Sequence, residues 1–206
     1  FWAASDVGWV VGHSYIVYAP LLAGNTTILY EGKPVGTPDP GAFWRVISEN
    51  DVRVLFTAPT AFRAIKKEDP TGEHIRRYDL SSLRYLFLAG ERTDPDTLHW
   101  AEDKLGIPVI DHWWQTETGG IMITPLAGIT PTKPSLATLP LPGVQPILVD
   151  PEGNELKGNS VEGILCIKHP WPGMLRSLYG DHERCFQTYF SAFKGLYLTG
   201  DGAKRD

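Results

Sequence analysis

Residues 83–110 read LRYLFLAGERTDPDTLHWAEDKLGIPVI and give the clearest indication of the fold class. The apolar run at 83–89 predicts a strand. Residues 94–105 begin Asp-Pro and predict a helix, because proline is well tolerated in the first helical turn. Residues 108–110 predict the next strand. Strand, helix and strand in this order are typical of a βαβ unit with parallel strands.

The same alternation extends towards the N-terminus. Residues 27–30 predict a strand, 43–49 a helix and 52–56 a further strand, and another helix is expected from Ala58-Pro59. We therefore predict a mainly parallel sheet over the first part of the chain. Ligands bind beyond the carboxyl ends of the strands in such sheets, so the residues that follow each strand are the first candidates for a site.

A proline-rich stretch separates this part from a second one. Six prolines lie between positions 125 and 146, which excludes a regular helix or a central strand there. Beyond them, short apolar runs at 144–149, 163–168 and 195–198 are separated by Gly/Pro/Asp turns. This pattern is typical of a β-rich unit.

The predicted fold class is therefore α/β, with a mainly parallel βαβ subdomain over residues 1–130 and a β-rich subdomain over residues 131–206. A chain of 206 residues is long enough for two such units. Its 42% hydrophobic and 21% charged residues are ordinary for a globular protein and argue against disorder.

Charge and cysteine content exclude several classes of function. The net charge is −5, so no basic field attracts nucleic acid or an anionic membrane. The longest apolar run, residues 15–23, is too short to span a bilayer and contains Pro20. Cys166 and Cys185 lack the spacing of a zinc site or a disulfide framework. We expect a reducing compartment, either the cytoplasm or, in a eukaryote, the mitochondrial matrix.

The densest polar cluster follows the strand predicted at 108–110. It reads DHWWQTETGG over residues 111–120, and neither a P-loop nor a dinucleotide-binding glycine motif occurs in the chain. Trp113 and Trp114 offer flat faces for a base or walls for an acyl pocket.

The hydroxyl and carboxyl groups of the same cluster suit a nucleotide. Thr116 and Thr118 offer hydroxyl donors to phosphate oxygens, and Glu117 offers the hard oxygen ligand that Mg²⁺ prefers. An equally open interpretation is a turn in which the tryptophans are core and the threonines cap a helix.

Two weaker clusters follow other predicted strands. Gly90-Glu91-Arg92 follows the strand at 83–89, and Gly90 would let a ligand pass close to the backbone. Asp201 follows the strand at 195–198, where a carboxylate accepts both hydroxyls of a ribose. A plain turn explains either cluster as well.

Five segments carry a family resemblance. They read GWVVGHSY at 8–15, TAPTA at 57–61, WWQTETG at 113–119, YGDHER at 179–184 and TGDG at 199–202. Together they resemble the short-chain acyl-CoA synthetases, the AMP-forming acetyl- and propionyl-CoA ligases of the adenylate-forming superfamily. The resemblance covers essentially the whole chain in order, and the segment at 113–119 is its most specific part.

The resemblance implies part of the large N-terminal domain of a ligase that joins a short-chain carboxylate to ATP and then transfers the acyl group to coenzyme A. Glu117 would hold Mg²⁺, Asp201 would bind the ribose hydroxyls, and no residue of the chain would act as a catalytic nucleophile. The nucleotide would be bound by Gly90, Glu91, Arg92, Asp111, His112, Trp113, Trp114, Gln115 and Thr116.

The acyl pocket follows from the same resemblance. Trp114 would form its floor and exclude long chains, and Trp9 would stand as an aromatic gate beside the pantetheine route. Val10, Val11 and Ala89 would complete the wall. Val10-Val11, Ala89, Gly90-Glu91-Arg92 and Val35 look like the propionyl branch of the family, whereas residues 120–206 look like the acetyl branch.

The family's phosphate loop, its downstream ATP-contacting arginines and its mobile C-terminal lid with the catalytic lysine have no counterpart in the sequence. We therefore expect the chain to be an internal fragment, inactive alone, whose partners are its small-molecule substrates and the missing N-terminal and C-terminal segments of the parent enzyme. The alternatives are a non-catalytic nucleotide-binding or structural α/β module, and an adenylate-forming ligase for longer chains. Trp114 argues against the second, because an open acyl channel needs a small residue there.

Overall fold

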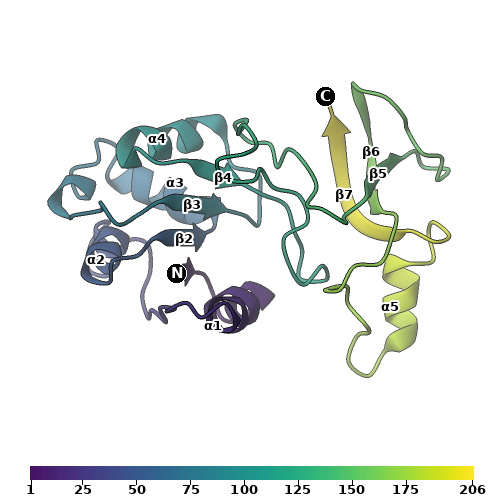
Figure 1. Ribbon diagram of the computed structural model, residues 1–206, viewed down its shortest axis with the longest axis horizontal. Helices are drawn as coiled ribbons and strands as arrows, with labels where there is room; N and C mark the ends of the chain where they lie inside the picture. The colour runs from purple at the N-terminus through teal and green to yellow at the C-terminus, as the bar shows by residue number, and fades with distance from the viewer. The chain divides into compact units, whose positions relative to one another are not determined.

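The computed structural model describes residues 1–206 as two compact units, Phe1–Leu139 and Pro140–Asp206 (Figure 1). The first unit contains a parallel sheet and the second an antiparallel one, so the predicted α/β class with a β-rich second part is confirmed. No helix combines the length and the apolar character that crossing a lipid bilayer requires.

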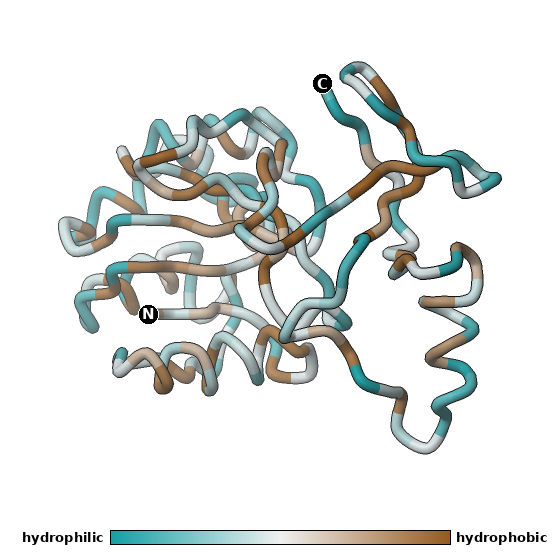
Figure 2. The backbone as a smooth tube through the Cα atoms, turned by 45° about the vertical axis from the view of Figure 1, so that its right-hand side comes forward, coloured by the Kyte–Doolittle hydropathy of each residue, from teal (hydrophilic) through white to brown (hydrophobic).

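Four parallel strands form the centre of the first unit. Their order in the sheet is the order in the chain: β1 (Trp2–Ala4), β2 (Val54–Thr57), β3 (Tyr85–Leu88) and β4 (Val109–Asp111). Figure 2 shows β2 and β3 as hydrophobic stretches, which is expected of strands buried on both faces. All four carboxyl ends therefore lie along one edge of the sheet.

The register of the sheet divides its side chains between two faces, because successive residues of a strand point to opposite sides. One face carries Trp2, Leu55, Leu86 and Val109, and the other carries Ala3, Phe56, Phe87 and Ile110.

Each face has its own helical cover. The helices α2 (Ala42–Glu49), α3 (Pro59–Glu68) and α4 (Pro95–Leu105) share a hydrophobic core with the face of Trp2. The π-helix η1 (Gly12–Tyr18) shares a smaller core with the opposite face and continues into α1 (Ala19–Leu22). A single 3₁₀ turn, η2 (Ile75–Arg77), completes the helical elements of the first unit.

The helix ends follow the signals in the sequence. Pro59 opens α3, and Asp94 caps α4 by accepting a hydrogen bond from the Thr97 N–H at 2.8 Å. Gly106 closes α4 with a φ of 63°, the left-handed conformation that favours glycine. The predicted helices at 43–49 and 94–105 are thus confirmed to within one residue.

The second unit is built on an antiparallel sheet. Its strands β5 (Pro146–Val149), β6 (Val161–Ile167) and β7 (Tyr197–Arg205) pair in that order, and α5 (His182–Tyr189) lies between the last two in the sequence. The Thr199 hydroxyl of β7 donates to the Leu165 carbonyl of β6 at 2.8 Å.

The prediction of a strand at residues 27–30 was wrong, because this segment does not pair with any strand of the sheet. It runs beside the chain start through only two hydrogen bonds: the Ile28 N–H donates to the Phe1 carbonyl at 3.3 Å, and the Phe1 amino group donates to the Thr26 carbonyl at 2.9 Å. The fourth strand is instead β1, whose three residues are too few to produce a readable pattern. The helices η1, α1 and α5 were also not predicted.

The second sheet gives a first prediction. A Cβ on Gly163 of β6 would lie 2.7 Å from the Val149 carbonyl oxygen of β5, so the two strands would have to separate. Gly163→Ala should lower the free energy of unfolding of the second unit by about 1–3 kcal/mol, measured by thermal unfolding. Gly202→Ala on β7 is the matched control, since its nearest neighbour would be 3.9 Å away. Equal destabilisation by the two variants would contradict the prediction.

Candidate functional site

A cavity of about 590 Å³ lies at the carboxyl ends of the parallel strands. Every strand of the sheet contributes residues that lie within five positions of its carboxyl end, as expected for a ligand site in a parallel α/β sheet. These residues are Ser5 and Asp6 after β1, Ala58, Thr60 and Ala61 after β2, Ala89 and Gly90 after β3, and Trp114, Gln115 and Thr116 after β4.

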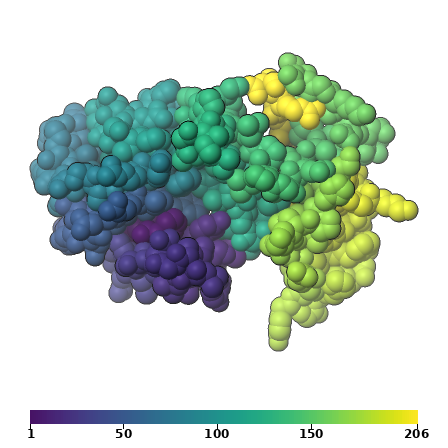
Figure 3. All heavy atoms as spheres, in the orientation of Figure 1, coloured from purple at the N-terminus to yellow at the C-terminus, as the bar shows by residue number.

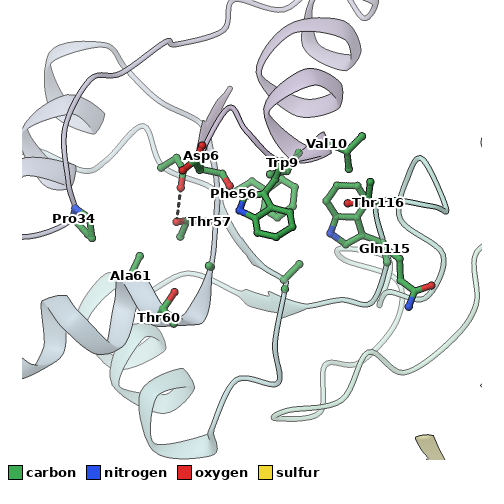
Figure 4. A pocket seen from close by; sticks show the side chains of 17 residues that line it. Asp6, Trp9, Val10, Pro34, Phe56, Thr57, Thr60, Ala61, Gln115 and Thr116 are labelled. Carbon is green, nitrogen blue, oxygen red and sulfur yellow. Dashed lines mark hydrogen bonds between the residues drawn. The ribbon is translucent and has the colours of Figure 1, made fainter. Parts of the chain in front are cut away.

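Figure 4 shows how the lining residues surround the space. Pro34, Thr60 and Ala61 lie on one side of the view, Gln115 and Thr116 lie on the other, and Trp9 stands between them. Trp9 is 67% exposed and lines the cavity, so it lies at the mouth of the cavity rather than in the core.

The segment that carries Trp9, Val10 and Val11 is held close to the start of η1 by a glycine. A Cβ on Gly12 would lie 2.5 Å from the Cα of Val7, which no side chain tolerates. The absence of that atom lets the loop after β1 fold back over the helix, and so brings these three residues to the cavity.

A side-chain hydrogen bond joins two strand ends in the wall of the cavity. The Thr57 hydroxyl at the end of β2 donates to the Ala4 carbonyl at the end of β1, at 2.8 Å (Figure 4). Thr57 is 2% exposed, so the bond is shielded from competing water. This hydrogen bond therefore fixes the distance between the ends of β1 and β2 without a bound ligand.

Gly90 presents bare backbone to the cavity. Its φ is 103°, a conformation that favours glycine, and nothing lies within 4 Å of the position a Cβ would take. A ligand in the cavity can therefore approach the peptide groups around Gly90 directly. The neighbouring Ala89 is buried in the core shared with η1.

The chain beyond β4 keeps the alternation of a strand, and this decides which of its side chains reach the cavity. His112 packs against Phe56 and Phe87, with ring centroids 5.0 and 5.9 Å apart, and thus lies on the η1 side of the sheet. Trp114, two residues on, lies on the same side and lines the cavity. Trp113 pairs through its backbone with Ile123.

The loop after Trp114 is closed by Thr118. Its buried hydroxyl lies 2.8 Å from the Gln115 carbonyl oxygen and accepts a hydrogen bond from the Gln115 N–H at 2.9 Å. The interpretation of Thr118 as a phosphate donor is therefore not supported, because that hydroxyl holds its own loop. Thr116, by contrast, is exposed and lines the cavity.

Two titratable groups at the end of β4, Asp111 and His112, are buried, and burial shifts each towards its neutral form. Burial raises the pKa of Asp111 to about 6, although the carboxylate accepts a hydrogen bond from the Thr93 N–H at 3.3 Å. Burial lowers the pKa of His112 to about 4, and no protein group makes a hydrogen bond to either ring nitrogen.

The structure brings about half of the predicted site residues to the cavity. The residues that line it are Trp9, Val10, Val11, Ala89, Gly90, Trp114, Gln115 and Thr116. The residues that adjoin it in sequence without lining it are Glu91, Arg92, Asp111, His112, Trp113 and Glu117. Glu91 forms an ion pair with Arg63 of α3, and Asp201 belongs to the second unit.

Several lining residues were not identified from the sequence as site residues. Asp6 and Ser5 follow β1, which the sequence did not reveal, and Pro34 comes from an irregular segment. Thr57 and Thr60 had a usable signal, because they directly follow a strand that was predicted. The rule that parallel strands deliver ligand-binding residues at their carboxyl ends would have found them.

A metal ion at this site would need ligands beyond the side chains of the protein. No group of three or more histidine, cysteine, aspartate or glutamate side chains is positioned to hold a metal. Mg²⁺ in phosphate-binding sites is commonly held by one or two carboxylates together with the phosphates. Glu117 directly follows Thr116 of the cavity wall in the sequence and is a carboxylate of the kind that such sites use.

Comparison with known proteins agrees with this geometry. Residues 1–179 match the family model described as AMP-binding enzyme. The acetyl-coenzyme A synthetases of Caulobacter vibrioides and Leptospira biflexa are 51% and 50% identical to the chain, and an uncharacterized protein of Pseudomonas aeruginosa is 53% identical. These alignments cover 100% of this chain and 32–33% of each relative, so the chain spans about a third of their length.

The buried histidine gives a second prediction. The folded protein binds fewer protons at His112 than the unfolded chain at pH values between about 4 and 6.5, so this residue's contribution to stability is complete above pH 6.5 and is lost as the pH falls. His112→Phe removes the contribution. The free energy of unfolding of the variant, relative to the unmodified chain, should therefore rise by about 2 kcal/mol between pH 7.5 and pH 5.

The measurement is urea unfolding of both proteins at each pH, followed by tryptophan fluorescence. Asp111 acts in the opposite direction, since its raised pKa makes the folded state lose stability as the pH rises towards 6. That contribution is present in both proteins and cancels in the comparison. A difference that does not change with pH would show that His112 is charged or solvated in the folded state.

Proposed function

The chain belongs to the AMP-binding enzyme family, and from that premise we propose that it forms the central part of an AMP-forming acyl-CoA synthetase for short-chain carboxylates, acetate or propionate. In the first step a carboxylate oxygen attacks the α-phosphorus of ATP, and pyrophosphate leaves. In the second step the thiol of coenzyme A releases its proton to water and attacks the acyl carbon, the bond from that carbon to the phosphate oxygen breaks, and AMP leaves.

One observation carries the proposal. The cavity at the strand ends combines a small apolar wall with exposed backbone at Gly90 and polar side chains at Gln115 and Thr116. Its volume of about 590 Å³ lies in the range of small-molecule sites. Joining an acid to a nucleotide needs both kinds of surface side by side, since the two reacting groups must be held in contact.

The nucleotide is assigned to the ends of β3 and β4. The open backbone at Gly90, with Glu91 and Arg92 beside it, suits the edge of a planar base. The segment Asp111 to Thr116 would continue around the base and the α-phosphate, with Thr116 donating to phosphate oxygens. Asp201 is proposed for the ribose hydroxyls on the strength of its motif.

The acyl group is assigned to the apolar wall. Trp114 and Ala89 line the cavity on the η1 side of the sheet, together with Val10 and Val11. We propose that the Trp114 indole is the floor of the acyl pocket and limits it to short chains, while Ala89 takes less space than a branched side chain would. Trp9 at the mouth suits the arm of coenzyme A. This arrangement disfavours a ligase for long-chain acids.

Magnesium and the absence of a nucleophile complete the proposal. A bound Mg²⁺ would neutralise phosphate charge as the anionic carboxylate approaches, and Glu117 is its proposed protein ligand. No side chain needs to form a covalent bond, because the attacking groups belong to the substrates. We propose that the isolated chain has no ligase activity, because the relatives it matches are about three times as long.

The test uses a chimaera in which residues 1–206 replace the matching third of the Caulobacter relative. Carboxylate-dependent exchange of pyrophosphate into ATP is measured with acetate, propionate, butyrate and octanoate. We expect exchange with acetate or propionate and little with octanoate. A well-folded chimaera that shows no exchange with any acid, or prefers octanoate, would overturn the proposal. Exchange by the isolated chain would contradict its inactivity.

Gly90 gives a third prediction. Gly90→Ala places a methyl group into the open space of the proposed base site and adds backbone strain of about 1 kcal/mol or more. The dissociation constant of AMP for the chimaera, measured by isothermal titration calorimetry, should rise at least about fivefold. Gly106→Ala is the matched control, because it also has a positive φ and open space but lies outside the cavity. Equal weakening by both variants would contradict the role of Gly90.

A further inference from the structure

Tyr15 of η1 makes contacts that are unusual for a residue on a surface helix. Its ring packs edge-on against Trp114, with centroids 5.3 Å apart and planes at 83°. It packs in the same manner against Phe56, at 5.2 Å and 79°. Phe56 and Trp114 both line the cavity, whereas Tyr15 does not. Tyr15 therefore lies behind two cavity residues and supports both.

The hydroxyl group of Tyr15 fixes the ring in this place. It accepts a hydrogen bond from the Ile121 N–H at 3.2 Å, across 106 positions of sequence. Ile121 belongs to the loop that leaves the cavity after Thr116 and returns to pair with Trp113 at Ile123. Burial raises the pKa of Tyr15, so the phenol is neutral and its hydrogen bond does not depend on pH near neutrality.

These contacts leave the Trp114 indole little freedom. The indole packs against two rings: Phe56, with centroids 6.3 Å apart, and Tyr15, with centroids 5.3 Å apart. Together these two rings restrict the position of the indole. Edge-to-face aromatic contacts have preferred geometries and contribute about 0.5–1.5 kcal/mol each beyond the area they bury. Loss of the Tyr15 ring would leave a void into which the indole can move.

We propose that Tyr15 is a positioning residue that holds Trp114 as the floor of the acyl pocket and thereby sets the length of the carboxylate that the enzyme accepts. The inference rests on the proposed function and assigns a determinant of selectivity that does not itself touch the substrate. A void behind the floor lets the indole retreat and makes room for additional methylene groups.

The experiment compares kcat/KM for propionate and hexanoate in the chimaera. Tyr15→Leu removes the ring and the hydroxyl, and we expect the propionate-to-hexanoate ratio to fall about tenfold. Tyr15→Phe keeps the ring but loses its tether to Ile121, and we expect a smaller fall of about threefold. If the leucine variant does not fold, the phenylalanine variant alone tests whether Tyr15 affects selectivity. The ratio does not depend on how much of the protein is folded.

A control on the same helix separates this role from general stability. Tyr18 of η1 is 62% exposed, and Figure 3 shows the N-terminal segment at the surface of the first unit. Tyr18→Leu should leave the ratio unchanged. In a Trp114→Ala background, Tyr15→Phe should have no further effect on the ratio, because the residue through which it acts is gone.

The outcomes distinguish the two proposals. A parent chimaera without carboxylate-dependent exchange overturns the proposed function. An active parent whose ratio is unchanged in both Tyr15 variants overturns only the role of Tyr15. The same holds if kcat/KM falls equally for both acids, since that result describes a structural residue without influence on selectivity.

Discussion

Burial of both faces of the parallel sheet is the constraint on which the first unit depends. Leu55, Leu86 and Val109 face the core of α2, α3 and α4, while Phe56 faces η1. A slip of one residue in any strand would exchange its two faces. The two cores therefore fix the register, and the register fixes which residues stand at the carboxyl ends. The position of the cavity follows from packing before any ligand is considered.

The same alternation divides the chemistry beyond the strand ends. His112 and Trp114 continue the parity of Ile110 and so lie on the η1 side, where space for a ligand remains. Asp111 has the opposite parity and contacts Thr93 instead. Neighbouring residues of the segment that follows β4 therefore point to opposite faces of the sheet.

The sequence was sufficient for the β-α-β core but not for the N-terminal segment. Residues 83–110 have long apolar runs, a proline at the helix start and an acidic cap, so local signals agree with the fold. β1 has three residues and depends on β2, more than fifty positions later. Residues 27–30 have the composition of a strand, yet they do not form a strand pairing with the sheet. Long-range pairing decides both cases, and no local pattern encodes it.

For the cavity, local motifs identified the residues but not their partners. Trp114 was recognisable from its motif, whereas its contact with Tyr15 joins positions about a hundred residues apart. The Thr57 to Ala4 hydrogen bond likewise joins two segments that are distant in sequence. Closing such long loops costs entropy, so these contacts depend on the packing of the whole unit and not on a local pattern. The shape of the cavity therefore depends on how η1 and β1 pack against the sheet, and it is a property of the whole unit.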